Sequence, residues 1–481
     1  MRSIRIGVLA AVIAVCGVSA AAQDAQGHDH AHERDLSGPP KAMPPVAPAS
    51  AEAPATPAGS QLKWLLLALE GRDDVKASDR VSPGFLEKVP ADKLDKVLND
   101  LRTGSGGFVL RSVEERDAAG LVAACEARAD RSMWKIVIEV EAEAPHRMTT
   151  LFFQPAPEAA VPALSSLDDA AKAIAEQGEK RALAVYRVAW GEGGAATLTP
   201  MLAVNEREPL ALGSAFKVFV LGALERAVSS GKLSWQAPVE IRDEWKSLPT
   251  GVMQRLPRGT EKPLSEYALN MMAISDNTAT DHIMGVLGRG EVERYYLERV
   301  KRPGRTMPFL TTREAFSIKV SMDGELLGVY ADADEAGRRE LLAGRVAETP
   351  PNEMVAQQWR IPQRVDAVEW FASAEEMCRA LAEALAAAKK PGNEPMLAAL
   401  TKNPGVPVSA SAWRTVAFKG GSEPGVLCLT WVLERASGEG AFAVCIAVND
   451  TRQPLDEQRL VGLGQRVLEW LEKAPSAPPA P

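Results

Sequence analysis

The order of the predicted elements in the C-terminal two thirds of the chain restricts its fold more than any other feature. Two strand-like runs, at residues 182–189 and 196–204, come before a long block of helical patterns. Three more strand-like runs follow this block, at residues 415–419, 425–434 and 441–449, and an amphipathic helix at 455–473 comes last. Strands on both sides of a helical block favour one antiparallel sheet with helices on its faces. We therefore predict an α+β fold for this part of the chain.

A smaller α+β unit is predicted before this region. Helical patterns at 62–69 and 85–101 precede four strand-like runs, at residues 107–113, 121–127, 133–141 and 148–154. In the third run Trp134, Ile136 and Ile138 alternate with other positions, which is typical of a half-buried strand. Helices followed by an antiparallel meander predict a small domain, and no obvious catalytic cluster lies in it.

The N-terminus has the pattern of an export signal. Arg2 and Arg5 precede an apolar run at residues 6–18, and Ala22 ends a small-residue cleavage site. The run is too short to span a bilayer. Cys16 suggests a lipoprotein as the less favoured alternative, because the bulky Val15 precedes it. We expect a periplasmic or secreted protein without an integral membrane segment after cleavage.

These patterns divide the 481 residues into a leader and two folded domains with flexible connections. We expect a signal peptide at 1–22, a disordered Pro/Ala-rich linker at 23–60, the small α+β domain at 61–155, a hinge at 156–166, the larger domain at 167–474 and a disordered tail at 475–481. The formal net charge is −8, and the chain has no basic cluster. A chain of this charge is not expected to bind nucleic acid.

An activated serine is predicted at the start of the apolar stretch at residues 210–224. Ser-x-x-Lys occurs four times, and only the copy at Ser214 opens an apolar helix. Residues three apart share a helix face, so the Ser214 hydroxyl and the Lys217 amine can meet. Burial favours the neutral form of a lysine. Lys217 is therefore a candidate base for a Ser214 nucleophile.

Histidine is too scarce for the commoner kinds of hydrolase site. Three of the five histidines lie in the expected linker, which leaves His146 and His282 for the folded regions. A Ser-His-Asp triad and a zinc site are therefore disfavoured, and no metal or cofactor is predicted. Cys428 and Cys445 fall on adjacent predicted strands. Export permits a disulfide between them, and a pair of buried free thiols is the alternative.

Two further motifs follow Ser214 along the chain. Ser275-Asp276-Asn277 comes after an apolar helix end, and Lys419-Gly420-Gly421-Ser422 ends a predicted strand. In this order the three motifs resemble those of the serine β-lactamase and penicillin-binding protein superfamily, closest to class A β-lactamases, over residues 167–474. The small domain and the stretch Phe309-Leu-Thr-Thr-Arg-Glu314 resemble the serine hydrolases of clavulanic acid clusters. Those proteins pair a steroid-isomerase-like (cystatin-like) domain with a β-lactamase-like one.

The resemblance implies catalytic roles for Ser214, Lys217, Ser275 and Lys419. Ser214 attacks a carbonyl and becomes acylated while Lys217 takes its proton. The Ser275 hydroxyl relays protons to the leaving group, and Lys419 adds positive potential near the substrate carboxylate. The implied partners are small molecules, namely β-lactams, related esters or amides, or cell-wall peptide.

The resemblance also implies substrate contacts. Asn277 hydrogen-bonds the side-chain amide of the substrate, Gly421 and Ser422 line the site, and the N–H groups of Ser214 and Ser422 form the oxyanion hole. Two departures matter: Gly420 stands where most relatives have a hydroxyl residue, and residues 302–366 hold no Glu-x-x-Leu-Asn element for deacylation. Acylation is thus better supported than turnover. The alternative is a D,D-peptidase of the penicillin-binding type or a non-hydrolytic protein that binds β-lactams or cell-wall peptide.

Overall fold

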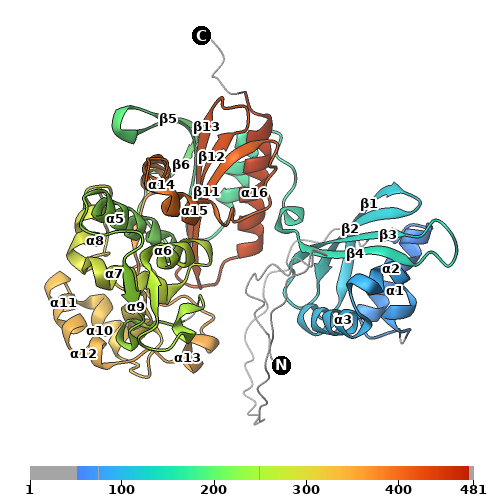
Figure 1. The fold of residues 1–481 in the computed structure, drawn as a ribbon, viewed down its shortest axis with the longest axis horizontal. Coiled ribbons are helices and arrows are strands. Elements are labelled where there is room, and N and C mark those ends of the chain that lie inside the picture. Colours follow the sequence, from blue (N-terminus) through green and yellow to red (C-terminus); the bar gives the residue numbers. More distant parts are fainter. Residues whose placement is uncertain (1–50, 74, 249, 476–481) are drawn as a thin grey trace. The chain divides into compact units, whose positions relative to one another are not determined.

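The structure, a computed structural model, describes residues 51–73, 75–248 and 250–475 in two compact units (Figure 1). The units are Met1–Ala160 and Val161–Pro481, and each has its own hydrophobic core. The predicted signal peptide, most of the predicted linker and all of the predicted tail except Pro475 lie outside the described residues. Among the described helices, none combines the length and the apolar character that a membrane span needs.

The described part of the N-terminal unit is an antiparallel meander of four strands with three α-helices. In β3, Trp134, Ile136 and Ile138 are buried, as their alternation predicts. Helix α1 packs on the sheet and buries Leu62 and Leu65. The helices are α1 (Pro57–Leu69), α2 (Pro83–Lys88) and α3 (Ala91–Ser105), and the sheet has the order β1 (Phe108–Asp117), β2 (Gly120–Ala127), β3 (Met133–Val140), β4 (Met148–Pro155).

Two helical regions of this unit differ from the prediction. Helix α1 already starts at Pro57, because the Thr56 hydroxyl accepts a hydrogen bond from the Gly59 N–H and proline suits the first helical turn. The end of the predicted linker is therefore helical. The single helix predicted at 85–101 is two helices, because Pro90 lacks an N–H and holds Val89 in an extended conformation between them.

The C-terminal unit is built on one five-stranded antiparallel sheet. Its first strand, β5, pairs with its last strand, β13, so that Lys180 lies opposite Asn449. The sheet has the order β11 (Trp413–Glu423), β12 (Val426–Arg435), β13 (Ala441–Asn449), β5 (Lys180–Trp190), β6 (Ala196–Val204). The predicted α+β fold, an antiparallel sheet flanked by helices, is confirmed.

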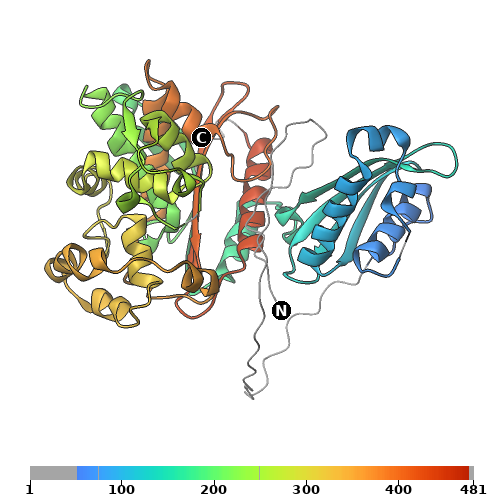
Figure 2. The same ribbon diagram turned by 60° about the horizontal axis from the view of Figure 1, so that its bottom comes forward.

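Helices cover both faces of this sheet (Figure 2). Helices α4 (Leu167–Ala175) and α16 (Glu457–Lys473) lie on one face, over large side chains such as Trp431. Helix α14 (Ala374–Ala388) lies on the other face, over small side chains such as Ala443. Side chains of a strand alternate between the two faces, so one strand can carry large residues on one face and small ones on the other. The small residues under α14 let this helix approach the sheet closely.

The two strand cysteines lie on the face that α14 covers. Cys428 and Cys445 are both buried and free, and their Sγ atoms are 4.0 Å apart. A disulfide bond holds its sulfur atoms about 2.05 Å apart. Of the two alternatives for this pair, the structure has free thiols.

The remaining helices form a block between β6 and β11. Ser373 and Glu376 form a capping box at the start of α14. Helix α6 begins at Leu264 and follows Pro263, which offers no side-chain cap. The block contains the helices α5 (Lys217–Ser229), α6 (Leu264–Ala273), α7 (Asn277–Leu287), α8 (Arg289–Leu297), α9 (Thr312–Lys319), α10 (Leu326–Asp332), α11 (Glu335–Ala343), α12 (Arg345–Glu348), α13 (Glu353–Gln358) and α15 (Glu394–Thr401), and the short strand pairs β7 (Leu210–Ala211) with β10 (Phe371–Ala372) and β8 (Pro238–Glu240) with β9 (Glu261–Pro263).

Candidate active site

Ser214 lies in a tight turn that leads directly into helix α5. The turn, Gly213–Phe216, is a 3-10 helix, and its residues are buried except for the half-buried Ser214. Phe216 stacks on Trp370 with the ring centroids 3.8 Å apart and meets Phe309 edge-on. These aromatic contacts fix the turn and leave one hydroxyl accessible in an otherwise apolar surrounding.

Lys217, the first residue of α5, is fully buried and points to the Ser275 motif. Its Nζ donates to the Ser275 carbonyl oxygen at 2.7 Å, to the Ser275 Oγ at 3.1 Å and to the Asn277 Oδ1 at 2.7 Å. Among the described residues, no hydrogen bond joins the Ser214 hydroxyl to Lys217. Burial, and after it the charge of Lys419, lower the pKa of Lys217 well below its usual value. This shift favours the neutral form of the amine, which can accept a proton.

The Ser275 hydroxyl lies between two lysines. The Lys419 Nζ is 3.1 Å from the Ser275 Oγ, the same distance as the Lys217 Nζ on the other side. Burial lowers the pKa of Lys419 to about 7. The backbone of Ser275 is left-handed, with φ 57°, and the Thr250 hydroxyl holds its carbonyl at 2.6 Å. A hydroxyl between two amines of lowered pKa can pass a proton from one to the other.

Asp276 holds the loop around residues 252–253 against the Ser275 motif. Its buried carboxylate accepts hydrogen bonds from the N–H groups of Ala279, Val252 and Met253 at 2.6–2.9 Å. A side chain at Gly251 would collide with this carboxylate, and the φ of 113° there also requires glycine. One sequence signal of this role exists, since aspartate directly before a helix is a favoured N-cap.

Asn277, the first residue of α7, binds Lys217 of α5 and the backbone at Leu248. Its Oδ1 accepts from Lys217, and its Nδ2 donates one hydrogen to the Leu248 carbonyl oxygen at 3.0 Å. An amide nitrogen carries two hydrogens. The expected contact of Asn277 with a substrate amide therefore depends on the second one.

Strand β11 runs against the Ser214 turn. A Cβ atom at Gly421 would lie well under 3.0 Å from the backbone atoms Leu212 O, Ser214 N and Ala215 N, a distance that Cβ atoms essentially never reach. A Cβ at Gly213 would be 2.9 Å from the Ser422 N. The turn and the strand that carry the two expected oxyanion-hole N–H groups are thus in backbone contact.

The Lys-Gly-Gly-Ser motif does not end its strand, contrary to the prediction. Strand β11 continues through Glu423, and Lys419 and Ser422 pair across to Thr430 and Leu427 of β12. Glycine is disfavoured in strands, so Gly420 and Gly421 indicate an end when read alone. Here the close approach of the Ser214 turn requires the glycine at 421, and pairing with β12 keeps the strand intact.

Two carboxylates of residues 302–366, Glu314 and Glu325, are not hydrogen-bonded to the described residues of the Ser275 cluster. Glu314 binds Arg289 at 2.5 Å and caps α9, while the Glu325 side chain is 87% exposed. A Glu-x-x-Leu-Asn pattern does occur earlier, at residues 266–270, but its Glu266, on α6, pairs with Lys262 of β9. The structure instead brings Glu369, which sequence reasoning missed, to the Gly213 N–H at 3.0 Å.

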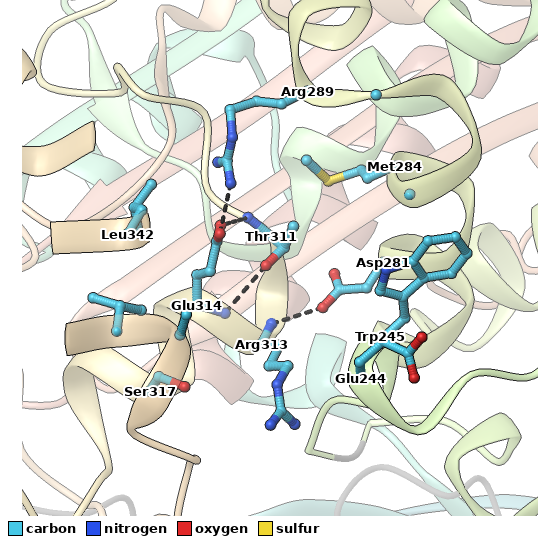
Figure 3. Close-up of a pocket in the computed structure, with 14 residues that line it drawn as sticks. Glu244, Trp245, Asp281, Met284, Arg289, Thr311, Arg313, Glu314, Ser317 and Leu342 are labelled. Carbon is cyan, nitrogen blue, oxygen red and sulfur yellow. Dashed lines mark hydrogen bonds and ion pairs between the residues drawn. The ribbon is translucent and has the colours of Figure 1, made fainter. Parts of the chain in front are cut away.

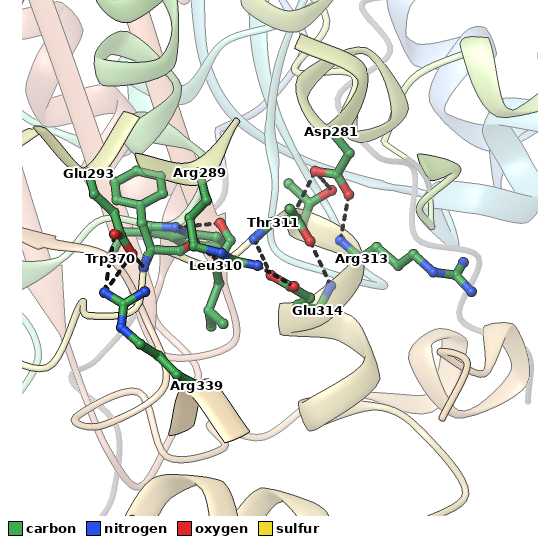
Figure 4. Close-up of polar contacts among 11 residues, drawn as sticks. Asp281, Arg289, Glu293, Leu310, Thr311, Arg313, Glu314, Arg339 and Trp370 are labelled. Atoms are coloured by element: carbon green, nitrogen blue, oxygen red, sulfur yellow. Dashed lines mark hydrogen bonds and ion pairs between the residues drawn. The ribbon is translucent and has the colours of Figure 1, made fainter. Parts of the chain in front are cut away.

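The Phe-Leu-Thr-Thr-Arg-Glu stretch fastens α9 to α7. The buried Asp281 accepts from the N–H and hydroxyl of Thr312 and from the Arg313 N–H at 2.8–2.9 Å (Figure 4). Burial raises the pKa of this carboxyl to about 7. The Thr311 side chain and Glu314 form a capping box at the start of α9. This stretch is therefore structural.

Beside these contacts is a cavity of about 500 Å³ between α7, α8 and α9 (Figure 3). Charged side chains of both signs line it, among them Glu244, Arg289 and Arg313, and Trp245 forms part of its wall. The described residues that line it include no residue of the Ser214, Ser275 or Lys419 motifs. The candidate site is thus the cluster around Ser275, not this cavity.

Two models of known protein families together match most of the chain. A family model described as "Beta-lactamase enzyme family" matches residues 169–470, and one described as "ORF 12 gene product N-terminal" matches residues 53–143. No curated protein matches the chain.

Several solved structures are similar to the C-terminal part. A beta-lactamase from Sphaerobacter thermophilus is 18% identical, with 65% of this chain and 98% of that chain covered and a TM-score of 0.42. A beta-lactamase from Chitinophaga pinensis is 17% identical, with 64% and 99% covered and a TM-score of 0.43. PBP-A is 16% identical, with 65% and 100% covered and a TM-score of 0.41.

Proposed function

The chain belongs to the beta-lactamase enzyme family, and from this premise we propose that it is a serine hydrolase that forms an acyl-enzyme on Ser214. One observation carries the proposal: the Ser275 hydroxyl lies 3.1 Å from the Nζ atoms of both Lys217 and Lys419. This arrangement supplies a neutral amine, a relay hydroxyl and a second amine within one buried cluster. Those are the groups that acyl transfer from a serine requires when no histidine serves as base.

The reaction begins with proton transfer from Ser214. Lys217, neutral because of its burial, takes the hydroxyl proton as Oγ attacks the substrate carbonyl carbon. The negative oxygen that develops is stabilised by the N–H groups of Ser214 and Ser422. Removal of one such donor typically costs about 3 kcal/mol of barrier lowering.

Collapse of the tetrahedral species gives the acyl-enzyme. The proton passes from Lys217 through the Ser275 hydroxyl to the leaving nitrogen or oxygen, and the carbonyl carbon loses its bond to that atom. Lys419, in its charged form, holds the substrate carboxylate beside Ser275. The substrate class that fits is a β-lactam or a related ester or amide, with Asn277 and Gly421 at the substrate's side.

The finer placement of the chain belongs to the same proposal. We assign residues 167–474 to a class A-like catalytic domain and residues 61–155 to a cystatin-like domain, as in clavulanate-cluster serine hydrolases. The four-stranded meander with α1 packed on it supports the second assignment. Export through the signal peptide at 1–22 places the protein in the periplasm or outside the cell.

A penicillin-binding D,D-peptidase, or a protein that binds β-lactams or cell-wall peptide without hydrolysis, is the second candidate. The observation that favours it concerns two carboxylates of residues 302–366, since Glu314 is paired with Arg289 and Glu325 is exposed. Neither is engaged with the Ser275 cluster. Such a protein would acylate and release its product slowly.

One experiment separates these functions. The mature protein is incubated with a chromogenic cephalosporin and with a nitrophenyl ester, and its intact mass is then recorded. We expect an adduct on Ser214 that Ser214→Ala lacks. Rapid turnover supports the hydrolase, and a persistent adduct supports the penicillin-binding type. Absence of both turnover and adduct contradicts the proposed chemistry.

A further inference from the structure

A buried lysine lies between two carboxylates next to the Ser214 turn. Lys319, the last residue of α9, has a side chain that is 2% exposed. Its Nζ is 3.3 Å from the Glu369 Oε1 and 2.5 Å from the Glu423 Oε1. Trp359 covers the ammonium, with its ring centroid 5.6 Å from Nζ. Three charged side chains from distant parts of the chain thus meet in one desolvated cluster.

Each carboxylate is fixed to a segment that carries an expected oxyanion-hole donor. The Glu369 Oε2 accepts from the N–H of Gly213, the residue before Ser214, at 3.0 Å. Glu423 directly follows Ser422 on β11. Lys319 therefore connects the backbone on one side of the hole with the backbone on the other. Of the described cations, it is the one that binds both segments.

The two carboxylates beside Lys319 keep its amine charged in spite of its burial. Burial alone lowers the pKa of Lys319, but the carboxylates of Glu423 and Glu369 raise it above the usual value, so the amine is charged. Burial also raises the pKa of Glu423 well above its usual range. Such buried clusters add little stability compared with apolar residues of the same volume.

We propose that Lys319 is a positioning residue, which sets the spacing of the Ser214 and Ser422 N–H groups by holding Glu369 and Glu423 together. The inference rests on the proposed acyl transfer at Ser214 and adds a residue to it that no motif contains. Lys319 touches no reacting atom, so it acts through the two backbone segments. Two donors stabilise an oxyanion only if both reach the same oxygen at 2.7–3.1 Å.

The test compares acylation of the wild-type protein and Lys319→Met by a fluorescent penicillin, at several concentrations, in a stopped-flow instrument. We expect the first-order acylation rate constant to fall about 10- to 100-fold, as for a displaced catalytic group. The dissociation constant of the preceding non-covalent complex should stay unchanged. The infrared carbonyl stretch of the acyl-enzyme should move to higher wavenumber, because weaker hydrogen bonds polarise the carbonyl less.

Two further variants keep the result interpretable. Lys389→Met removes a second ion pair outside the site, in which Lys389, 38% exposed, binds Glu434 of β12, 7% exposed. It should lower the melting temperature and leave the carbonyl band and the acylation rate unchanged. If Lys319→Met does not fold, the triple variant Lys319→Met, Glu369→Gln, Glu423→Gln removes all three charges at similar volume. It should fold and show the same loss of rate and band shift.

The outcomes distinguish this inference from the function on which it rests. A folded Lys319 variant that acylates at the wild-type rate with an unmoved carbonyl band overturns the positioning role alone. A rate loss of equal size in Lys389→Met also overturns it, because general destabilisation then accounts for the effect. A wild-type protein that gains no adduct on Ser214 overturns the proposed function, and the inference with it.

Discussion

We expect a single methyl group added at Gly421 to displace the Ser214 turn from strand β11. A Cβ there would lie well under 3.0 Å from three backbone atoms, Leu212 O, Ser214 N and Ala215 N. Backbone atoms cannot turn aside as a side chain can. The Gly421→Ala substitution must therefore push strand β11 and the Ser214 turn apart.

The size of the effect follows from this geometry. Ordinary contact begins at 3.4 Å, so the strand and the turn must separate by roughly 1 Å, and a displacement of about 1 Å in a catalytic group can lower a rate about 100-fold. Overpacking in a well-packed region typically costs about 1–3 kcal/mol of unfolding free energy. We expect Gly421→Ala to fold with reduced stability and to acylate about 100-fold more slowly than the wild type.

The assay is acylation by a fluorescent penicillin, with urea unfolding as the stability measurement. Gly464→Ala is the matched control, because its Cβ would lie 2.7 Å from Trp431 Cη2 on the face of the sheet that α16 covers. It should lose similar stability but acylate at the wild-type rate. If Gly421→Ala acylates as fast as the wild type, the contact between β11 and the turn does not set the oxyanion hole.

Three further predictions concern Lys419, Asp281 and the two strand cysteines. Burial lowers the pKa of Lys419 to about 7, and a lysine loses its charge as pH rises, so acylation by an anionic penicillin should weaken above pH 7. Acylation by an uncharged nitrophenyl ester should not weaken there, and identical pH profiles would contradict the assigned role of Lys419. Asp281→Asn places an amide N–H against the Arg313 N–H and should lower the unfolding free energy in urea by about 1–3 kcal/mol; an unchanged value would mean that the bond is dispensable. Because Cys428 and Cys445 are free and buried, iodoacetamide should label both only after unfolding without reductant, as read by intact mass, and failure to label them then would indicate a disulfide.

The elements that were predictable are those set by local patterns. Alternation of side chains defined β3, and the capping box at Ser373 defined the start of α14, because both depend on neighbours in sequence. Boundaries shifted where a single residue decided them, as at Pro90. The extension of β11 through its glycines depends on pairing with β12, which no local pattern reports.

The residues of the candidate site also differ in whether local patterns could predict them. The three motifs were visible because each is a short run of characteristic residues, and the structure brings Lys217, Ser275 and Lys419 together. Glu369 was not visible, since it is a lone acid in a segment without periodicity. Its place is set by the Gly213 N–H, 156 residues earlier in the chain. Contacts of this range come from the fold as a whole.

The pairing of β5 with β13 affects how the protein folds while it is being synthesised. The first strand of the sheet, β5, pairs with β6 on one side, and its partner on the other side is the last strand, β13, with Lys180 opposite Asn449. Pairing over such a separation closes a very long loop and is slow. A chain that is still being made or exported already contains Ser214 and Ser275, yet it lacks the strands that bring Lys419 to them. We therefore expect the acylating site to exist only in the finished chain, so that an incomplete one passes through the cell unreactive.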